Sequence, residues 1–390
     1  MKNLILKQKI LEICITEGSQ SLADISKALN SSIPTITKLV GELISEGYVE
    51  DLGKIDTSGG RRPSIYGLNP SAGYFVGIDV TRNGFAIATT DFKGNIVDFT
   101  RNQEFILANN EESFKDFCRL VLDHIDSIGI SQGSVLAYGM SFSGRVNSHT
   151  GESFSYYIKD GKDIRSLMER ELEKPVFIEN NSRAMTYAEY LCGQHGKKRD
   201  ILFINVSWGL GMGMIIDGNL TFGKSGFSGE IGHFPILDNN QICQCGKIGC
   251  LETGASCSAL YRIITEKLRS GRSSMLSEKF KNDGKVTMQD IMDAIYEEDI
   301  LAIETVEQIG HTLGRAVAGL INLFNPELVV IGGLLASASE YLRLPVMSAI
   351  QKYTLNIISR DTEIKFSSLG EQAGAMGACM IARSRLLEIL

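Results

Sequence analysis

The sequence has no surplus of basic residues and no long apolar run. Its 390 residues carry a net charge of −7, which argues against a broadly basic nucleic-acid binder but leaves room for a small DNA-reading module on an acidic body. The N-terminal stretch MKNLILKQKILEI is interrupted by Lys7, Gln8 and Lys9, so it lacks the apolar core of a signal peptide. No apolar run approaches membrane-spanning length. We therefore expect a cytoplasmic protein that does not insert into a membrane.

Cysteine is scarce and unevenly placed. Of eight cysteines, five are scattered and three fall within eight residues, a pattern that does not form a disulfide framework and fits a reduced compartment. The three lie in residues 229–254, GEIGHFPILDNNQICQCGKIGCLETG, which also contain a histidine ten positions before the first cysteine. Three thiols and one imidazole are the donor set of a closed tetrahedral zinc site. The spacing predicts a structural Zn²⁺ bound by His233, Cys243, Cys245 and Cys250.

Two other interpretations of this segment remain open. The cysteines could be buried free thiols beside a surface histidine, which is common for scattered cysteines in a reducing compartment. A catalytic zinc is disfavoured, because four protein ligands leave no open position for water. The clustering favours the structural metal site.

Two carboxylates flank the predicted ligands. Glu230 lies three residues before His233, and Glu252 lies two residues after Cys250. A carboxylate accepts hydrogen bonds from two sugar hydroxyls at once, so a zinc-braced pair of acids suits a hydroxyl-rich ligand. The alternative is that one glutamate only orients His233 through its second ring nitrogen.

The first 68 residues have the pattern of a winged helix-turn-helix. Three segments with apolar residues at helical spacing are followed by two strand-like pieces around the loop Gly59-Gly60-Arg61-Arg62-Pro63. The third segment has one apolar stripe, formed by Ile33, Ile36, Val40, Leu43 and Ile44. The third helix is expected to enter the major groove, and the two arginines of the wing suit the minor groove or phosphates. The predicted DNA-contacting residues are Ser31, Ser32, Thr35, Lys38, Glu42, Arg61 and Arg62. A solvated loop, or a winged domain that contacts proteins, is the alternative.

The remainder of the chain alternates strands and helices. After a short linker at residues 69–73, strand, tight turn and strand occur in sequence at 75–96, and a weak repeat of that pattern follows at 202–220. The repeat indicates two similar α/β lobes. We expect one lobe at 74–190 plus 370–390 and a second, with the zinc site, at 191–369.

These motifs together resemble the ROK family of repressors and sugar kinases over nearly the whole chain. The resemblance is carried by GEIGH and GCLE around the cysteines, GGRRP in the wing, Ile178-Glu179-Asn180, Asn325-Pro326-Glu327, Ile331-Gly332-Gly333 and residues 369–374. It implies an α/β, actin-like or hexokinase-type two-lobed ATPase fold behind an α-rich winged domain. It also implies sugar contacts, between the lobes, at Ser143, Gly144, Asn180, Asn181, Glu230, His233 and Glu252.

Three features of the family's kinases are altered here. The acidic general base expected after Glu-Asn is replaced by Asn181, which cannot usefully accept a proton. The glycine-rich phosphate loop reads Asp79-Val80-Thr81-Arg82-Asn83, and the second glycine turn reads Gly209-Leu210-Gly211 without its hydroxyl. We therefore expect no catalytic residues and no use of ATP or Mg²⁺.

The resulting hypothesis is a sugar-responsive repressor of carbohydrate genes that binds operator DNA as a homodimer or homotetramer. Sugar or sugar phosphate would shift lobe closure and so reposition the winged domains. One alternative is an ATP-dependent sugar kinase that has kept a DNA-binding domain. Another is that the effector is a protein, such as a sugar-transport component.

Overall fold

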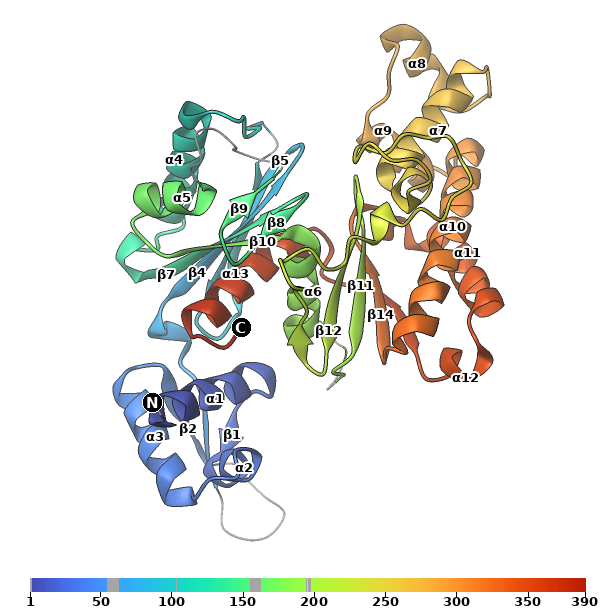
Figure 1. Ribbon diagram of the computed structural model, residues 1–390. Helices are drawn as coiled ribbons and strands as arrows, with labels where there is room; N and C mark the ends of the chain where they lie inside the picture. Colours follow the sequence, from blue (N-terminus) through green and yellow to red (C-terminus); the bar gives the residue numbers. More distant parts are fainter. Residues whose placement is uncertain (1, 55–62, 103, 155–162, 194, 196–197) are drawn as a thin grey trace. The chain divides into compact units, whose positions relative to one another are not determined.

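The computed structural model describes residues 2–54, 63–102, 104–154, 163–193, 195 and 198–390. The chain forms two compact units, Met1–Cys192 with Gln372–Leu390, and Gly193–Glu371. Within these described ranges, no helix is both long and apolar enough to cross a membrane. Each unit is built around its own sheet (Figure 1).

The first unit begins with three helices and a small sheet. The helices are α1 (Lys2–Thr16), α2 (Leu22–Ala28) and α3 (Ile33–Ser45), and the strands are β1 (Gln20–Ser21), β2 (Val49–Lys54) and β3 (Ser64–Leu68). The strand order is β1-β3-β2, so the wing has a short third strand that the sequence pattern did not predict. Ser32 caps α3, because its side chain accepts a hydrogen bond from the Thr35 amide.

The second part of this unit is a five-stranded mixed sheet. Its strands are β4 (Tyr74–Thr81), β5 (Gly84–Asp91), β6 (Ile96–Asn102), β7 (Val135–Phe142) and β10 (Val176–Asn180), in the order β10-β7-β4-β5-β6. The remaining elements are α4 (Glu111–Ser127), β8 (Val146–Asn147), β9 (Glu152–Ser153), α5 (Ile164–Leu172), α6 (Asn181–Cys192) and α13 (Ala373–Leu386).

Glycines let the last helix, α13, lie directly on this sheet and on α6 (Figure 1). A Cβ atom at Gly77 of β4 would stand 2.0 Å from the Ala375 carbonyl oxygen, and one at Gly139 of β7 would stand 2.0 Å from that of Ala378. A Cβ atom at Gly377 would similarly meet Ala184 of α6 at 1.9 Å. Close packing therefore fixes the C-terminal helix in the first unit, although the rest of that unit is far from the helix in sequence.

The winged domain packs on the same unit. The ring of Tyr48 stacks on Phe92 with centroids 5.4 Å apart, and the Gln8 amide donates to Glu388 at 2.7 Å. One apolar cluster includes Ile10 of α1, Leu39 of α3, and Phe75 of β4. The winged domain and the first five-stranded sheet thus share an apolar core.

The second unit repeats the topology of the first sheet. Strands β11 (Ile201–Val206), β12 (Leu210–Ile216), β13 (Asn219–Leu220), β14 (Leu328–Gly332) and β15 (Glu363–Phe366) have the order β13-β12-β11-β14-β15. In both sheets the first strand is central, two antiparallel strands lie on one side and two parallel strands on the other. The sequence repeat at 75–96 and 202–220 is the first hairpin of each sheet.

Helices complete the second unit. They are α7 (Cys257–Arg269), α8 (Ser277–Asp283), α9 (Met288–Tyr296), α10 (Ile300–Phe324), α11 (Ser339–Tyr353) and α12 (Asn356–Ser359). Helices α10 and α11 pack closely, since a Cβ atom at Gly310 would lie 2.7 Å from Pro345 and one at Gly314 would lie 2.5 Å from the Val346 carbonyl oxygen. The segment with the clustered cysteines lies between β13 and α7.

Candidate functional site

The cysteine segment is folded by glycines against the edge of β12. A Cβ atom at Gly229 would lie 1.9 Å from the Met212 carbonyl oxygen, and one at Gly232 would lie 2.3 Å from that of Leu210. Gly246 and Gly249 have φ values of 83° and 75°, a left-handed conformation that favours glycine. These four positions explain why the GEIGH lead-in and the turns between cysteines hold their shape.

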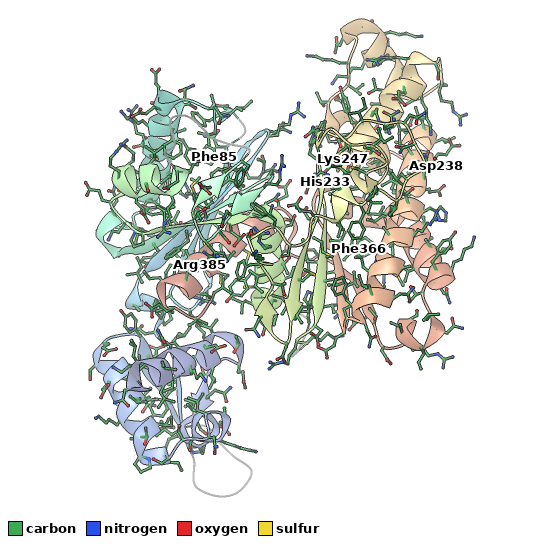
Figure 2. The ribbon with its side chains drawn as sticks, in the orientation of Figure 1. Phe85, His233, Asp238, Lys247, Phe366 and Arg385 are labelled. Atoms are coloured by element: carbon green, nitrogen blue, oxygen red, sulfur yellow. The ribbon has the colours of Figure 1, made fainter. Side chains whose placement is uncertain are left out.

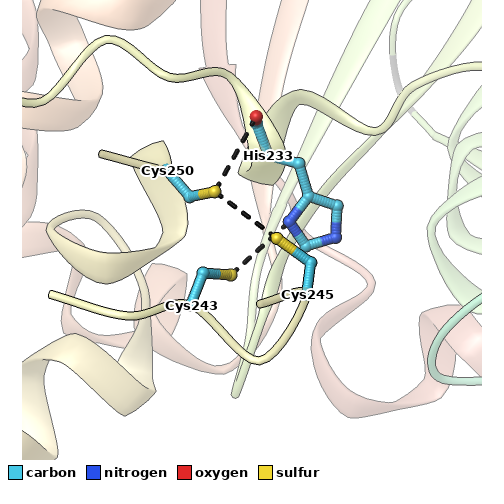
Figure 3. Close-up of side chains that lie close together, drawn as sticks. All are labelled: His233, Cys243, Cys245 and Cys250. Carbon is cyan, nitrogen blue, oxygen red and sulfur yellow. Dashed lines mark hydrogen bonds between the residues drawn. The ribbon is translucent and has the colours of Figure 1, made fainter. Parts of the chain in front are cut away.

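The segment brings the four predicted metal ligands together (Figure 3). The Cys243 sulfur lies 3.6 Å from His233 Nδ1, and the Cys245 sulfur lies 3.6 Å from that of Cys250. The ligand atoms all lie within 4.8 Å of one another. In a tetrahedral zinc site with bonds of 2.0–2.3 Å, ligand atoms are about 3.3 to 3.8 Å apart. The donor set and its spacing therefore fit a tetrahedral metal ion.

Two of the three clustered thiols are buried. Cys243 and Cys250 are buried, and desolvation raises the pKa of the Cys243 thiol to about 12. A metal ion is what would hold such a sulfur as a thiolate at neutral pH. His233 and Cys245 are half-buried, so one side of the cluster faces outward.

The two flanking carboxylates lie on different sides of this cluster. Glu230 Oε2 stands 3.7 Å from His233 Nε2, the ring nitrogen that faces away from the thiols. Glu252 accepts a hydrogen bond from the Leu210 amide at 3.0 Å, and its other oxygen lies 3.7 Å from the Cys243 sulfur. A Cβ atom at Gly209 would lie 2.7 Å from the Glu252 carboxylate, so the β11–β12 turn lies directly against this side chain. Figure 2 shows His233 on the second unit.

The other predicted sugar contacts lie in the first unit. Asn181 donates to the Ser143 hydroxyl at 3.2 Å, and Asn180 donates to the Gly144 carbonyl oxygen at 2.8 Å. The Asn180 oxygen also accepts from the Ser182 amide at 3.0 Å, so this side chain caps α6. The four residues Ser143, Gly144, Asn180 and Asn181 therefore form one hydrogen-bonded group.

The sequence interpretation did not predict a buried cluster of charged side chains, formed by Glu179, Arg183 and Arg385. Glu179, at the end of β10, is fully buried and accepts from Arg183 at 2.6 Å and from Arg385 of α13 at 3.2 Å. Arg385, labelled in Figure 2, also donates to the Ser148 carbonyl oxygen at 2.8 Å. The i,i+4 spacing of Glu179 and Arg183 was a weak sign of an ion pair between them. No sequence pattern indicated the contact with Arg385, because Glu179 and Arg385 are 206 positions apart.

The segment aligned with a phosphate loop is a tight hairpin turn. Thr81 pairs with Gly84, which leaves Arg82 and Asn83 as the two turn residues between β4 and β5. Asp79 accepts a hydrogen bond from Ser141, and a Cβ atom at Gly374 would lie 2.3 Å from its carboxylate. Desolvation raises the pKa of the Asp79 carboxyl to about 6, although the Ser141 hydrogen bond opposes this shift. This carboxylate is committed to contacts within the fold.

The outward face of helix α3 differs from the one that the sequence pattern indicated. Its buried residues are Ile36, Leu39, Val40 and Leu43. Ile33, assigned to the apolar stripe, is 52% exposed. Lys38 is exposed and Thr35 is half-buried, whereas Thr37 and Gly41 are exposed and were missed. The exposed positions of the central turns are thus Thr37, Lys38 and Gly41.

The other predicted DNA contacts have local partners or fall outside the described residues. The Ser31 hydroxyl donates to the Leu29 carbonyl oxygen, and Ser32 caps the helix. Lys7 of α1 binds Glu42 at 2.8 Å, and this hydrogen bond lowers the pKa of the Glu42 carboxyl. Arg61 and Arg62 of the wing lie outside the part of the chain that the structure describes.

Known proteins resemble the chain over most of its length. A model of the ROK family matches residues 75–385, and one of a winged helix-turn-helix DNA-binding domain matches residues 4–50. The xylose repressor of Bacillus subtilis (strain 168) is 29% identical over 389 residues, covering 99% of this chain and 97% of that protein.

Two solved structures are similar in fold. A crystal structure of a ROK family transcriptional regulator, a homologue of the E. coli Mlc protein, has a TM-score of 0.81 and 26% identity, covering 100% of this chain and 98% of that one. A ROK family glucokinase from Streptomyces griseus, in complex with glucose and AMPPNP, has a TM-score of 0.68 and 23% identity, covering 80% of this chain and 100% of that one. These neighbours confirm the predicted hexokinase-type fold behind a helical winged domain.

Proposed function

The chain belongs to the ROK family and carries an N-terminal winged helix-turn-helix domain, and from this premise we propose that it is a sugar-responsive transcriptional repressor of carbohydrate genes. The observation that supports the proposal is the presence, in one chain, of a winged helix-turn-helix domain and of a His/Cys cluster that could hold a metal ion, with two carboxylates beside it. Relatives named as xylose repressors match nearly the whole length, winged domain included. We place its action in the cytoplasm.

The DNA side of the proposal depends on the outward face of α3. A Cβ atom at Gly41 would meet nothing within 4 Å, so no contact inside the protein requires glycine there. Glycine in a helix interior costs about 1 kcal/mol relative to alanine. Close approach of a DNA backbone gives a reason for its presence, with Lys38 beside it for phosphate contact. Ser31, Ser32, Thr35, Glu42, Arg61 and Arg62 remain proposed contacts, of which Glu42 acts by positioning Lys7.

The sugar side depends on the divided roles of the His233 ring. Its Nδ1 faces the thiols, which leaves Nε2 beside Glu230 for a ligand hydroxyl. A structural Zn²⁺ on His233, Cys243, Cys245 and Cys250 would fix this orientation. The proposed sugar contacts in the second unit are Glu230, His233 and Glu252, and those in the first unit are Ser143, Gly144, Asn180 and Asn181.

We propose that the kinase chemistry of the fold is lost. Asn181 supplies an amide where a sugar hydroxyl would need a base. The turn at Arg82 and Asn83 has no glycine whose bare backbone could approach phosphates. A sugar kinase that retains a DNA-binding domain is the second candidate, because proteins named as glucokinases match 80% of the chain.

Two partners follow from the proposal. Operator DNA with two half-sites requires two recognition helices, and hence at least a homodimer. The effector is a sugar or sugar phosphate, and a sugar-transport protein is the alternative effector. Sugar binding changes the fit of the paired winged domains to the half-sites.

The experiment uses the full-length, zinc-loaded protein. DNA selected from a random pool is labelled, and its release is followed by fluorescence anisotropy while the protein's melting temperature is measured with xylose, glucose, their phosphates and ATP. We expect one sugar or sugar phosphate to raise the melting temperature and release DNA, and ATP to do neither. Stabilisation by ATP together with sugar-dependent ADP formation would favour the kinase instead.

A matched variant separates the sugar contact from the metal site. Glu252→Gln keeps an acceptor for the Leu210 amide but removes the charge that receives sugar hydroxyls. We expect its affinity for the effector to fall by about 10- to 100-fold. Zinc content and DNA binding should stay at the wild-type level. Unchanged effector affinity would remove Glu252 from the sugar site.

A further inference from the structure

The second unit contains an open cavity of about 600 Å³ that has no part in the sites described above. Its walls are the loop at 237–241, the pair Thr253 and Gly254, the outward side of α7, and Gln308 and Thr312 of α10. Among the described residues that line it, none is a predicted metal ligand or a proposed sugar contact. The cavity is therefore a separate place at which a small molecule could bind.

Polar side chains form most of the cavity wall. The amides of Asn239, Gln241 and Gln308 can both donate and accept hydrogen bonds, and the carboxylate of Asp238 accepts them. Asp238, labelled in Figure 2, is exposed, whereas Asn239 and Gln241 are half-buried. An apolar ligand would leave these groups without partners, so the lining favours a compound rich in hydroxyl groups.

Lys267 of α7 brings a positive charge to this wall. Its Nζ donates to the Thr305 hydroxyl of α10 at 3.2 Å, and that fully buried hydroxyl donates in turn to the Leu301 carbonyl oxygen. Lys267 is half-buried, and it forms no ion pair with any residue that the structure describes. An ammonium group donates more than one hydrogen bond, so donors remain for a ligand. A half-buried cation without a carboxylate partner favours an anionic group in the cavity.

Arg262 adds a second cation that is already held in place. Its guanidinium donates to the Glu266 carboxylate at 3.1 Å and to the Thr253 carbonyl oxygen at 2.9 Å. Glu266 balances the charge of Arg262, and water screens the exposed Asp238. The uncompensated charge of the cavity is therefore that of Lys267.

The wall opposite α7 is held by hydrogen bonds. The Asn239 amide donates to the Thr253 hydroxyl at 3.2 Å, and this hydroxyl donates to the Cys250 carbonyl oxygen at 2.8 Å. These bonds fix the wall before any ligand arrives. A pre-formed wall lowers the cost of ordering side chains on binding.

We propose that this cavity binds a sugar phosphate, with the phosphate group at Lys267 and the sugar hydroxyls at Asp238 and the amides. Lysine binds phosphate as a point charge, and a carboxylate accepts hydrogen bonds from hydroxyls. The proposed sugar contacts of this unit instead include Glu230 and Glu252, whose charges oppose a phosphate group. The inference goes beyond the proposed function, because the cavity shares no residue with that site.

Calorimetric titration of the full-length, zinc-loaded protein tests the site. The probes are inorganic phosphate, ribose 5-phosphate and glucose 6-phosphate at constant ionic strength. We expect at least one sugar phosphate to bind at least about tenfold more tightly than inorganic phosphate, because the amides and Asp238 contact its hydroxyls. Lys267→Met should weaken that binding at least about tenfold. The Thr305 hydroxyl keeps its bond to Leu301 in this variant, so the fold should be kept.

Three further variants separate this cavity from the rest of the protein. Gln308→Glu, at an exposed position of the wall, adds a negative charge with little change of shape and should weaken binding at least about tenfold. Lys281→Met, on the exposed side of α8, is the matched control for Lys267→Met and should bind like wild type. Glu252→Gln should also bind the sugar phosphate like wild type. Thermal unfolding checks the fold of each variant.

Several outcomes would overturn the proposal. One is a wild type that gives neither heat nor a rise in melting temperature with any probe at millimolar concentration. Another is a Lys267→Met variant that binds like wild type. Equal affinities for inorganic phosphate and both sugar phosphates would remove sugar recognition from the cavity. Binding that is lost in Glu252→Gln and kept in Lys267→Met would assign the sugar phosphate to the proposed sugar site instead.

Discussion

Two carboxylates of this protein, one in each unit, differ in their surroundings. In the first unit, Asp79 is enclosed by Ser141 and the Gly374 backbone, behind a turn of only two residues. In the second unit, the Glu230 side chain remains 36% exposed beside the outward nitrogen of His233. An enclosed carboxylate serves packing, whereas a braced and partly exposed one can exchange water for a ligand. The difference between a structural acid and a binding acid therefore lies in what surrounds it.

The largest effect should come from removing the brace of the exposed site. Cys245 is only half-buried, so Cys245→Ser removes a proposed metal ligand with little loss of packing. Structural zinc contributes about 10 kcal/mol of apparent binding energy in small domains, so the melting temperature should fall by more than about 10 °C. Zinc content per chain and thermal unfolding measure this effect, and a chelator should reproduce it in the wild type.

Cys257→Ser provides the control for that variant. Cys257 is fully buried at the start of α7, where its thiol faces the Val206 carbonyl oxygen at 3.8 Å. This change should leave zinc content intact. If Cys245→Ser kept its zinc and its response to sugar, the metal would not hold Glu230 and Glu252 in place. The metal would then not explain why Glu230 differs from the enclosed Asp79.

A smaller, pH-dependent effect is expected at the enclosed site. The folded pKa of Asp79 is about 6, above its ordinary value, so the folded state holds this proton more tightly than the unfolded state. The associated stability is fully present below about pH 4 and is lost as pH rises through about 6. Asp79→Asn removes that loss. Between pH 5 and pH 8, the free energy of unfolding of the variant should therefore rise by about 1 to 3 kcal/mol relative to that of wild type.

Thermal unfolding of the variant and of wild type at pH 5 and at pH 8 measures this gain, as the change between the two pH values in the stability difference between the two proteins. Ser141→Ala removes the hydrogen bond that favours the ionised form of Asp79, so it should move the loss of stability to higher pH. A constant difference between Asp79→Asn and wild type at all pH values would mean that Asp79 is not held in a desolvated position.

Sequence patterns predicted the features whose residues lie close together in the chain. The convergence of His233 with the three cysteines was predictable because the four residues lie within 18 consecutive positions. In α3, the predicted stripe is confirmed at Ile36, Val40 and Leu43, whereas buried Leu39 was not predicted. The salt bridge between Glu179 and Arg385 was not, because its partners are brought together only when α13 packs on the sheet. The exposure of Ile33 was missed for a related reason, since periodicity defines a stripe but not where neighbouring helices stop covering it.

The smallest expected effect tests whether chemistry can be returned to the fold by one residue. Asn181→Asp would place a base at the start of α6, where the side chain already contacts the Ser143 hydroxyl. A general base contributes about 10²- to 10⁴-fold to a rate, but only when the phosphoryl donor is held in line. The two-residue turn after Asp79 offers no such cradle, so we expect no sugar-dependent ADP formation above background in a coupled assay. A thermal shift with the effector would verify that the variant still binds sugar. Measurable turnover would break the comparison, because it would show that the first unit still binds ATP productively and that Asn181 alone separates this protein from a kinase.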